Sequence, residues 1–184
     1  MKRFLAAVMM TTVLAAGCSP TPKSTENRAV KEAEVKEAIA LFKANDPGIQ
    51  RFFDRSAGWA VIPKVFKGAF VVGGAYGNGI VYENGIATGY TSLSQATLGF
   101  SFGGEFFREI IFFRTTEDLN RFRQGKFTFS AQATAVAVKA GAAAKADYQD
   151  GMAVFVMSDV GLMVDASIGG QEFKYEPIVR SGRQ

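Results

Sequence analysis

Side chains that could carry out chemistry are few in this 184-residue chain. It has no histidine, and Cys18 is its only cysteine. These absences exclude histidine acid–base catalysis, Ser-His-Asp and Cys-His nucleophile pairs, and zinc sites built from histidine or cysteine. They also exclude a disulfide within the chain. One thiol, a set of carboxylates and several basic residues beside aromatic rings remain as candidates.

The thiol of Cys18 has the sequence context of a lipid attachment site. Lys2 and Arg3 precede an apolar stretch at residues 4–16, which is short for a membrane-spanning helix and typical of a signal peptide. Residues 13–18 read Val-Leu-Ala-Ala-Gly-Cys, which resembles the lipobox of bacterial lipoproteins. The thiolate would accept a diacylglyceryl group, and the small residues would let the peptidase reach the backbone. The alternative is an ordinary signal peptide with a chance cysteine.

These features predict a signal peptide at residues 1–17, a lipidated tether at residues 18–27 and a single domain at residues 28–184. The tether is polar and carries two prolines, so we expect it to be flexible. Acyl chains on Cys18 would anchor the protein permanently, since each buried methylene contributes about 0.8 kcal/mol. Ser19 after the cysteine resembles lipoproteins sorted to the outer membrane. We therefore expect a cell-envelope protein on the outer membrane, facing the periplasm.

The carboxylates form no recognisable active site. Glu105 and Glu109 bracket Arg108 and would share one face of a strand, where we expect a solvated or ion-paired role rather than acid–base catalysis. The aspartates at 147, 150, 159 and 165 lack the spacing of a calcium loop. The glycine-rich residues 71–79 lack the Gly-Lys-Ser/Thr ending of a phosphate loop and predict a turn between strands. We therefore expect no enzyme, no cofactor and no metal.

Basic residues beside aromatic rings are the more suggestive set. One group follows Pro63 in a predicted loop, and the other surrounds a predicted short helix. The first group is Lys64, Phe66 and Lys67, and the second is Arg114, Arg121, Phe122, Arg123 and Lys126. Such residues attract an anionic lipid surface, at about 1 kcal/mol per basic residue. Two alternatives stay open: scattered solubilising charge, and an apolar cavity in a curved sheet that holds an acyl chain.

The overall charge does not indicate nucleic-acid binding. The formal net charge is +4, and Lys2 and Arg3 lie in the predicted signal peptide. The rest of the chain therefore carries an excess of only about two basic residues, with no clustered stripe of Lys and Arg. We expect no nucleic-acid partner, and the sequence specifies no protein partner.

Hydrophobic periodicity predicts an α+β domain. Residues 28–45 have the spacing of an amphipathic helix that stops before Pro47, and a second short helix follows. Short strands are predicted from residue 57 onward, at 59–63, 69–72 and 80–82 and then after an Asn84-Gly85 hairpin turn. A capped helix is expected up to residue 123, and alternation at 127–138 indicates one half-buried strand. The expected architecture is a curved antiparallel sheet or partial barrel with N-terminal amphipathic helices.

Three segments resemble the SYLF-domain family. Residues 52–75 include Gly-x-Ala-Val-x-Pro at 58–63, and this motif is followed by Gly-Gly-x-x-Gly-x-Gly at 73–79. Residues 99–104 together with 109–113, and residues 161–170, also fit the family. The likeness extends over residues 29–176, which is nearly the whole predicted domain.

The resemblance implies a function in lipid binding. Eukaryotic members of the family bind phosphoinositides and other anionic lipids, the yeast member also binds actin, and bacterial members resemble envelope lipoproteins. We therefore expect a non-enzymatic domain that binds anionic phospholipid and is attached to a membrane through acylated Cys18. The alternative is a structural or protein-interaction module of the envelope, which contacts another envelope component or a host protein such as actin.

Overall fold

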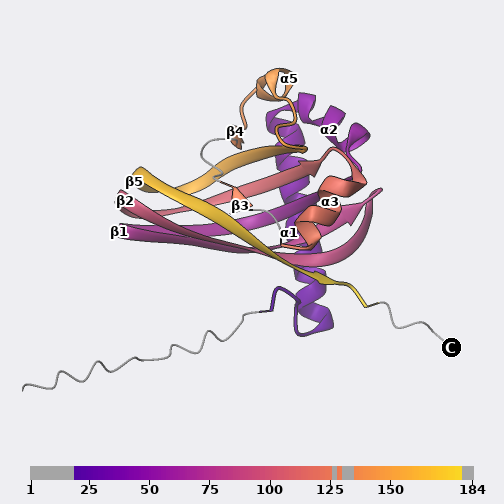
Figure 1. Cartoon of the computed structure of the whole chain (residues 1–184), viewed down its shortest axis with the longest axis horizontal. Helices are drawn as coiled ribbons and strands as arrows, with labels where there is room; N and C mark the ends of the chain where they lie inside the picture. The colour runs from indigo at the N-terminus through magenta and orange to yellow at the C-terminus, as the bar shows by residue number, and fades with distance from the viewer. Residues whose placement is uncertain (1–18, 126–127, 130–134, 180–184) are drawn as a thin grey trace, which may run out of the picture.

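The computed structural model describes residues 19–125, 128–129 and 135–179 (Figure 1). Three long strands dominate this part of the chain: β1 (Gly58–Glu83), β2 (Ile86–Phe113) and β5 (Met152–Pro177). The sheet order is β1-β2-β5-β3, and β4 pairs with β5. The shorter elements are α1 (Thr25–Asn45), η1 (Pro47–Ile49), α2 (Gln50–Arg55), α3 (Thr116–Arg123), β3 (Thr128–Phe129), β4 (Ala135–Ala137) and α5 (Ala142–Lys145). The predicted α+β class with a curved sheet is confirmed.

Each long strand bends back and contributes to two layers (Figure 1). A straight strand of the length of β1 would span about 85 Å. Instead its two ends meet, because Asn84 N donates a hydrogen bond to Ala57 O at 3.2 Å. β2 pairs with β1 and with β5 along most of its length, so all three strands follow the same bend.

Glycines allow the two halves of β1 to touch. A Cβ atom on Gly79 would lie 2.0 Å from Val61 O, and one on Gly77 would lie 2.8 Å from Lys64 O. Only a hydrogen fits at such distances, so these positions require glycine for close backbone approach. The glycine-rich residues 71–79 are therefore part of a continuous strand, and the predicted turn there is wrong.

Apolar side chains on the two faces of the strands form two hydrophobic cores. The inner core lies between the two layers and includes Ile62, Leu93 and Ile111, with Leu119 and Phe122 of α3. The outer core lies between the sheet and the remaining helices. Its largest members are Phe42, Ile49, Phe52, Ile80, Ile110, Phe112 and Phe155. Figure 1 shows α1 crossing behind the sheet, with α2 and α5 above it.

Helix termini follow local signals. α1 begins at Thr25, three residues earlier than predicted, because Ser24 Oγ accepts a hydrogen bond from Asn27 N at 3.1 Å and caps the helix. α3 begins with the predicted cap, since Thr115 and Asp118 form a capping box. None of the described helices is long and apolar enough to span a membrane.

The sequence predicted shorter strands than the structure contains. Pro63 was expected to end a strand, but β1 continues through it, because Pro63 lies at the register shift between Ile62 and Val65, where it has no partner on β2. Residues 127–138 were expected to form one strand. The described parts are two strands that pair with β5 in opposite directions: β3 is antiparallel to it, and β4 is parallel. Residues 126–127 and 130–134 lie outside the described residues.

Candidate functional site

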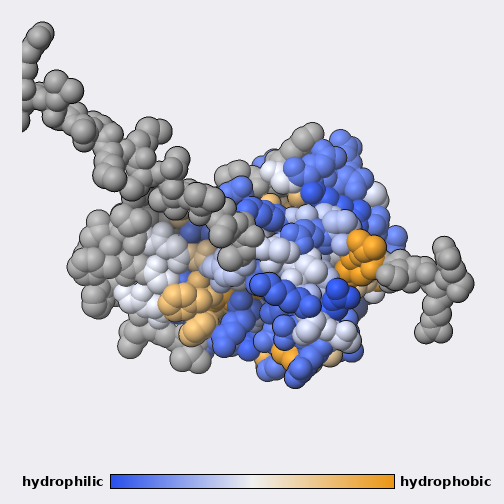
Figure 2. Space-filling model, turned by 90° about the horizontal axis from the view of Figure 1, so that it is seen from below, coloured by the Kyte–Doolittle hydropathy of each residue, from blue (hydrophilic) through white to orange (hydrophobic). Residues whose placement is uncertain are grey.

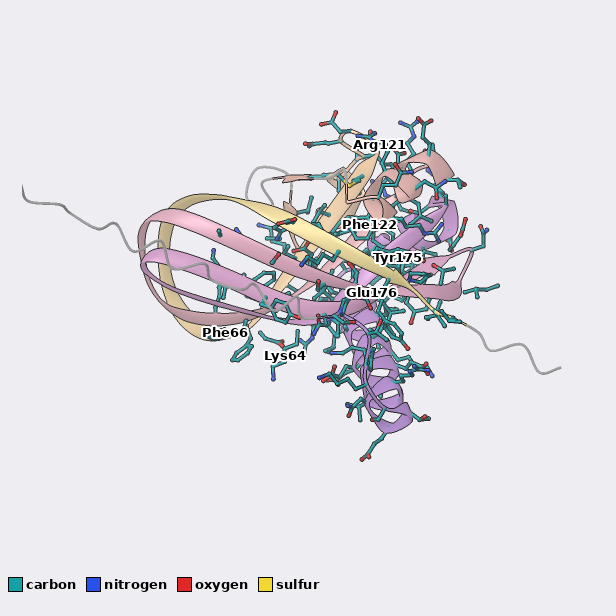
Figure 3. All side chains as sticks on the ribbon, turned by 60° about the horizontal axis from the view of Figure 1, so that its bottom comes forward. Lys64, Phe66, Arg121, Phe122, Tyr175 and Glu176 are labelled. Atoms are coloured by element: carbon teal, nitrogen blue, oxygen red, sulfur yellow. The ribbon has the colours of Figure 1, made fainter. Side chains whose placement is uncertain are left out.

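Part of the first basic–aromatic group forms an exposed patch on β1 and β2. Phe66 is 51% exposed, and its ring centroid lies 5.2 Å from that of Phe106 on the paired strand. Lys64 Nζ lies 4.8 Å from the Phe106 centroid. We refer to these three residues as the Lys64–Phe66–Phe106 patch. Figure 3 shows Lys64 and Phe66 pointing away from the ribbon.

A β-bulge sets which side chains of this segment face outward. The register between β1 and β2 shifts between Ile62 and Val65. Both residues are fully buried although they are an odd number of positions apart, so the shift reverses the alternation and leaves Phe66 exposed. The sequence predicted Phe66 as a lipid contact, but no sequence feature indicated the bulge that exposes it.

Lys67 does not belong to this patch. It is 6% exposed, and its Nζ lies 4.0 Å from Glu105 Oε1. The prediction placed Lys67 in a loop, whereas it follows Phe66 in a strand and therefore points to the opposite face. Burial removes Lys67 from the candidate lipid contacts.

Two members of the second group have structural roles. Phe122 is fully buried, with its ring 4.8 Å from Phe113. Arg123 Nη2 donates to Glu83 Oε2 at 2.8 Å and to Thr88 Oγ1 at 2.9 Å, which holds α3 against the β1–β2 hairpin. The prediction that Phe122 and Arg123 contact lipid is wrong, because Phe122 packs in the core and Arg123 binds the β1–β2 hairpin.

The other members of the second group do not join the first. Arg121 is exposed and lies 3.3 Å from Asp118 Oδ1, and Arg114 is exposed near the ring of Tyr148. In Figure 3, Arg121 lies well apart from Lys64 and Phe66, so Arg121 does not belong to the Lys64–Phe66–Phe106 patch. The remaining predicted residues, Lys126 and the attachment residue Cys18, lie outside the described residues.

The segment predicted as a flexible tether lies against the end of β5. Ser19 Oγ donates a hydrogen bond to Glu176 Oε2 at 2.6 Å, Thr21 Oγ1 donates to the same oxygen, and Pro20 is buried between them. These hydrogen bonds lower the pKa of the Glu176 carboxyl, and the bond from Ser19 has the largest effect. We refer to Ser19, Pro20, Thr21 and Glu176 as the N-terminal seam. No feature of the sequence indicated this contact.

A groove adjoins the N-terminal seam. Its volume is about 480 Å³, and beside the seam residues its walls are Arg28, Tyr90, Pro177, Ile178 and Val179. Val179 is 83% exposed. Figure 2 shows an orange, apolar patch where the described chain ends, next to the grey C-terminal residues. The groove thus combines an exposed apolar surface with one cation, Arg28, and one carboxylate, Glu176.

Glu109 lies in the interior instead of at the surface. It is completely buried between the two layers, where Gln171 Nε2 donates to its Oε2 at 3.0 Å. Oε1 of Glu109 and Oε1 of Gln171 have no hydrogen-bond partner in the structure. Burial raises the pKa of Glu109 to about 7, against the smaller effect of the Gln171 hydrogen bond. The predicted solvated or ion-paired role is wrong for Glu109, whereas Glu105 pairs with Lys67.

The described residues contain no group of three or more side chains that could hold a metal ion. Among the exposed arrangements in this part of the chain, the cation–aromatic patch and the groove beside the N-terminal seam combine apolar surface with a basic side chain. Both suit an amphipathic surface better than a small polar substrate.

Comparison with known proteins gives two matches. Residues 94–176 match a model of the Ysc84 (SYLF) family, described as "Las17-binding protein actin regulator". Beta cell expansion factor A from Aeromonas veronii is 27% identical over 136 residues, which cover 73% of this chain and 51% of that protein. The chain therefore spans about half the length of this curated relative.

Proposed function

Because residues 94–176 match the SYLF family, as the sequence resemblance predicted, we propose that the chain is a non-enzymatic lipoprotein whose domain binds phospholipid. Acylated Cys18 would attach it to the outer membrane, facing the periplasm. The observation that carries the proposal is the Lys64–Phe66–Phe106 patch, in which a half-exposed ring lies beside a cation.

The contacts of the patch would contribute a modest free energy of membrane binding, which suits a domain that also has a lipid anchor. Full burial of a Phe side chain contributes about 1.5–3 kcal/mol, and Phe66 is about half buried before any membrane contact. Lys64 would add about 1 kcal/mol near an anionic surface. Attachment through Cys18 would strengthen this binding further, because it raises the effective concentration of lipid at the patch.

The first prediction concerns Phe66. Phe66→Ser is expected to lower the fraction of domain, residues 19–184, that co-sediments with phosphatidylglycerol vesicles, by about fivefold, because about 1 kcal/mol of ring burial is lost. Tyr76→Ser is the matched control, since Tyr76 is another exposed ring on β1, 42% exposed and outside the patch. Equal failure of the unmodified domain to bind anionic and neutral vesicles would reject lipid binding.

The second prediction concerns Cys18. Cys18→Ser is expected to abolish incorporation of radiolabelled palmitate and to leave an unprocessed or soluble protein, because the only thiol is lost. Its circular dichroism spectrum should match that of the unmodified domain. Ser19→Ala should keep the label, since it retains the thiol. Palmitate on the Cys18→Ser protein would contradict the anchor.

A protein-interaction module is the second candidate. It is favoured by the description of the matching family as an actin regulator. Crosslinking in intact cells separates the two candidates. A single abundant protein adduct, together with no affinity for vesicles, would support the interaction module against lipid binding.

A further inference from the structure

The N-terminal seam leaves little free chain between residue 18 and the domain. Ser19, the residue that follows Cys18 in the sequence, binds Glu176 through its hydroxyl, and consecutive Cα atoms are about 3.8 Å apart. A free segment of nine residues, 19–27, would let its ends separate by about 15 Å and point in any direction. Here Ser19 and Thr21 bind Glu176, and Ser24 already caps α1.

A group attached to Cys18 would therefore lie next to the groove described above. The groove presents Pro177, Ile178 and the exposed Val179, and Arg28 lies on its wall. Apolar side chains with a cation beside them match the boundary between lipid headgroups and acyl chains. A phosphate-bearing headgroup next to Cys18 would pair with Arg28, while the carboxylate of Glu176 on the same wall is bound by the hydroxyls of Ser19 and Thr21.

We propose that the N-terminal seam holds the domain in one orientation on the membrane, with the groove of Arg28, Tyr90 and Pro177–Val179 against the bilayer. This inference rests on the proposed acylation of Cys18 and adds the groove to the Lys64–Phe66–Phe106 patch as a surface that meets the lipid. The seam acts as a positioning contact: it limits rotation about the anchor. α5 then faces away from the bilayer, since Figure 1 shows it on the side opposite the two ends of the described chain.

The test uses full-length acylated protein in vesicles of phosphatidylethanolamine and phosphatidylglycerol. When Cys18 is acylated, an engineered cysteine is the only free thiol in the chain. A fluorophore is attached at Val179→Cys, or at the exposed α5 position Ala144→Cys, and is quenched by lipids that carry nitroxide groups. We expect severalfold stronger quenching at 179 than at 144.

Breaking the seam should remove this difference. In a Glu176→Ala background, quenching at 179 is expected to fall toward that at 144, because Ser19 and Thr21 lose their common acceptor. Glu172→Ala is the matched control, since Glu172 is an exposed carboxylate on the same strand and outside the seam. It should leave the difference unchanged. Thermal unfolding of both variants should match that of the unmodified protein.

Each outcome decides between orientation and anchoring. Equal quenching at the two positions in the unmodified protein, or a difference that survives Glu176→Ala, would overturn the inference. If the protein also incorporates palmitate and sediments with membranes, the proposed function stands without a fixed orientation. If palmitate is not incorporated, the proposed anchor and the orientation fail together.

Discussion

Gly79→Ala is expected to lower the melting temperature of the domain by about 6–12 °C. The added Cβ would lie 2.0 Å from Val61 O and 2.8 Å from the carbonyl carbon of Val61, and both are backbone atoms that cannot rotate away. Overpacking typically costs about 1–3 kcal/mol, and we expect a cost of about 3 kcal/mol here because the backbone contacts cannot relax. In a domain of this size, each kcal/mol shifts the melting temperature by about 2–4 °C.

Thermal unfolding followed by circular dichroism measures this effect, and Gly74→Ala is its control. Gly74 lies on the same strand, but a Cβ there would meet Gln95 O at 3.4 Å, an ordinary contact. We expect Gly74→Ala to stay within about 2 °C of the unmodified domain. An unchanged melting temperature for Gly79→Ala would mean that the two halves of β1 do not touch.

Glu109→Gln is expected to stabilise the domain at pH 8 by about 3 kcal/mol. The pKa of Glu109 is raised from 4.5 to about 7 by burial, so the unfolded chain releases this proton at a lower pH than the folded domain. The contribution of Glu109 to the stability of the unmodified domain is therefore fully present below about pH 4.5 and is lost as the pH rises to about 7. The difference between the two pKa values corresponds to about 3 kcal/mol, which the variant does not lose.

The hydrogen bonding of Glu109 also predicts that the domain is less stable when Glu109 is ionised. The buried pair contains two acceptors without a donor, Oε1 of Glu109 and Oε1 of Gln171. A proton on the carboxyl, or the amide N–H groups of the Glu109→Gln variant, supplies the missing donor. An ionised Glu109 supplies none, and it also carries a charge in a low-dielectric interior.

Urea unfolding at pH 5 and pH 8 measures the dependence. The unmodified domain should lose stability between these values, and Glu109→Gln should not. Glu105→Gln is the control, since Glu105 is a partly exposed carboxylate that pairs with Lys67, and its replacement should bring no gain at pH 8. Identical pH profiles for the unmodified domain and for Glu109→Gln would contradict a neutral, buried Glu109.

The faces of the strands decide which of the predicted lipid contacts are exposed. Phe66 and Lys67 are neighbours in sequence and were predicted together, yet one is 51% exposed and the other is 6% exposed. Phe122 was predicted as an exposed ring, but α3 packs it between the layers of the folded sheet. Charge and aromaticity near each other in sequence identify possible lipid contacts, and only the pairing of strands decides which side chains reach the surface.

Local signals in the sequence determined where several elements begin and end. The Asn84-Gly85 turn requires two residues with positive φ, and these adopt 49° and 79°. Thr115 and Asp118 cap α3, and α1 ends before Pro47. Each of these features depends on residues within a few positions, so the sequence alone was sufficient to predict it. The same holds for the chemistries excluded by the missing histidines and the single cysteine.

The tertiary structure alone decided how distant segments meet. The return of β1 on itself depends on the contact between Gly79 and Val61, the burial of Glu109 depends on its pairing with Gln171, and the N-terminal seam joins Ser19 to Glu176, 157 residues later. A periodic pattern reports which side of a strand is apolar, but not where the strand bends or which surface it meets. The orientation proposed for the membrane-bound domain therefore follows from the folded chain.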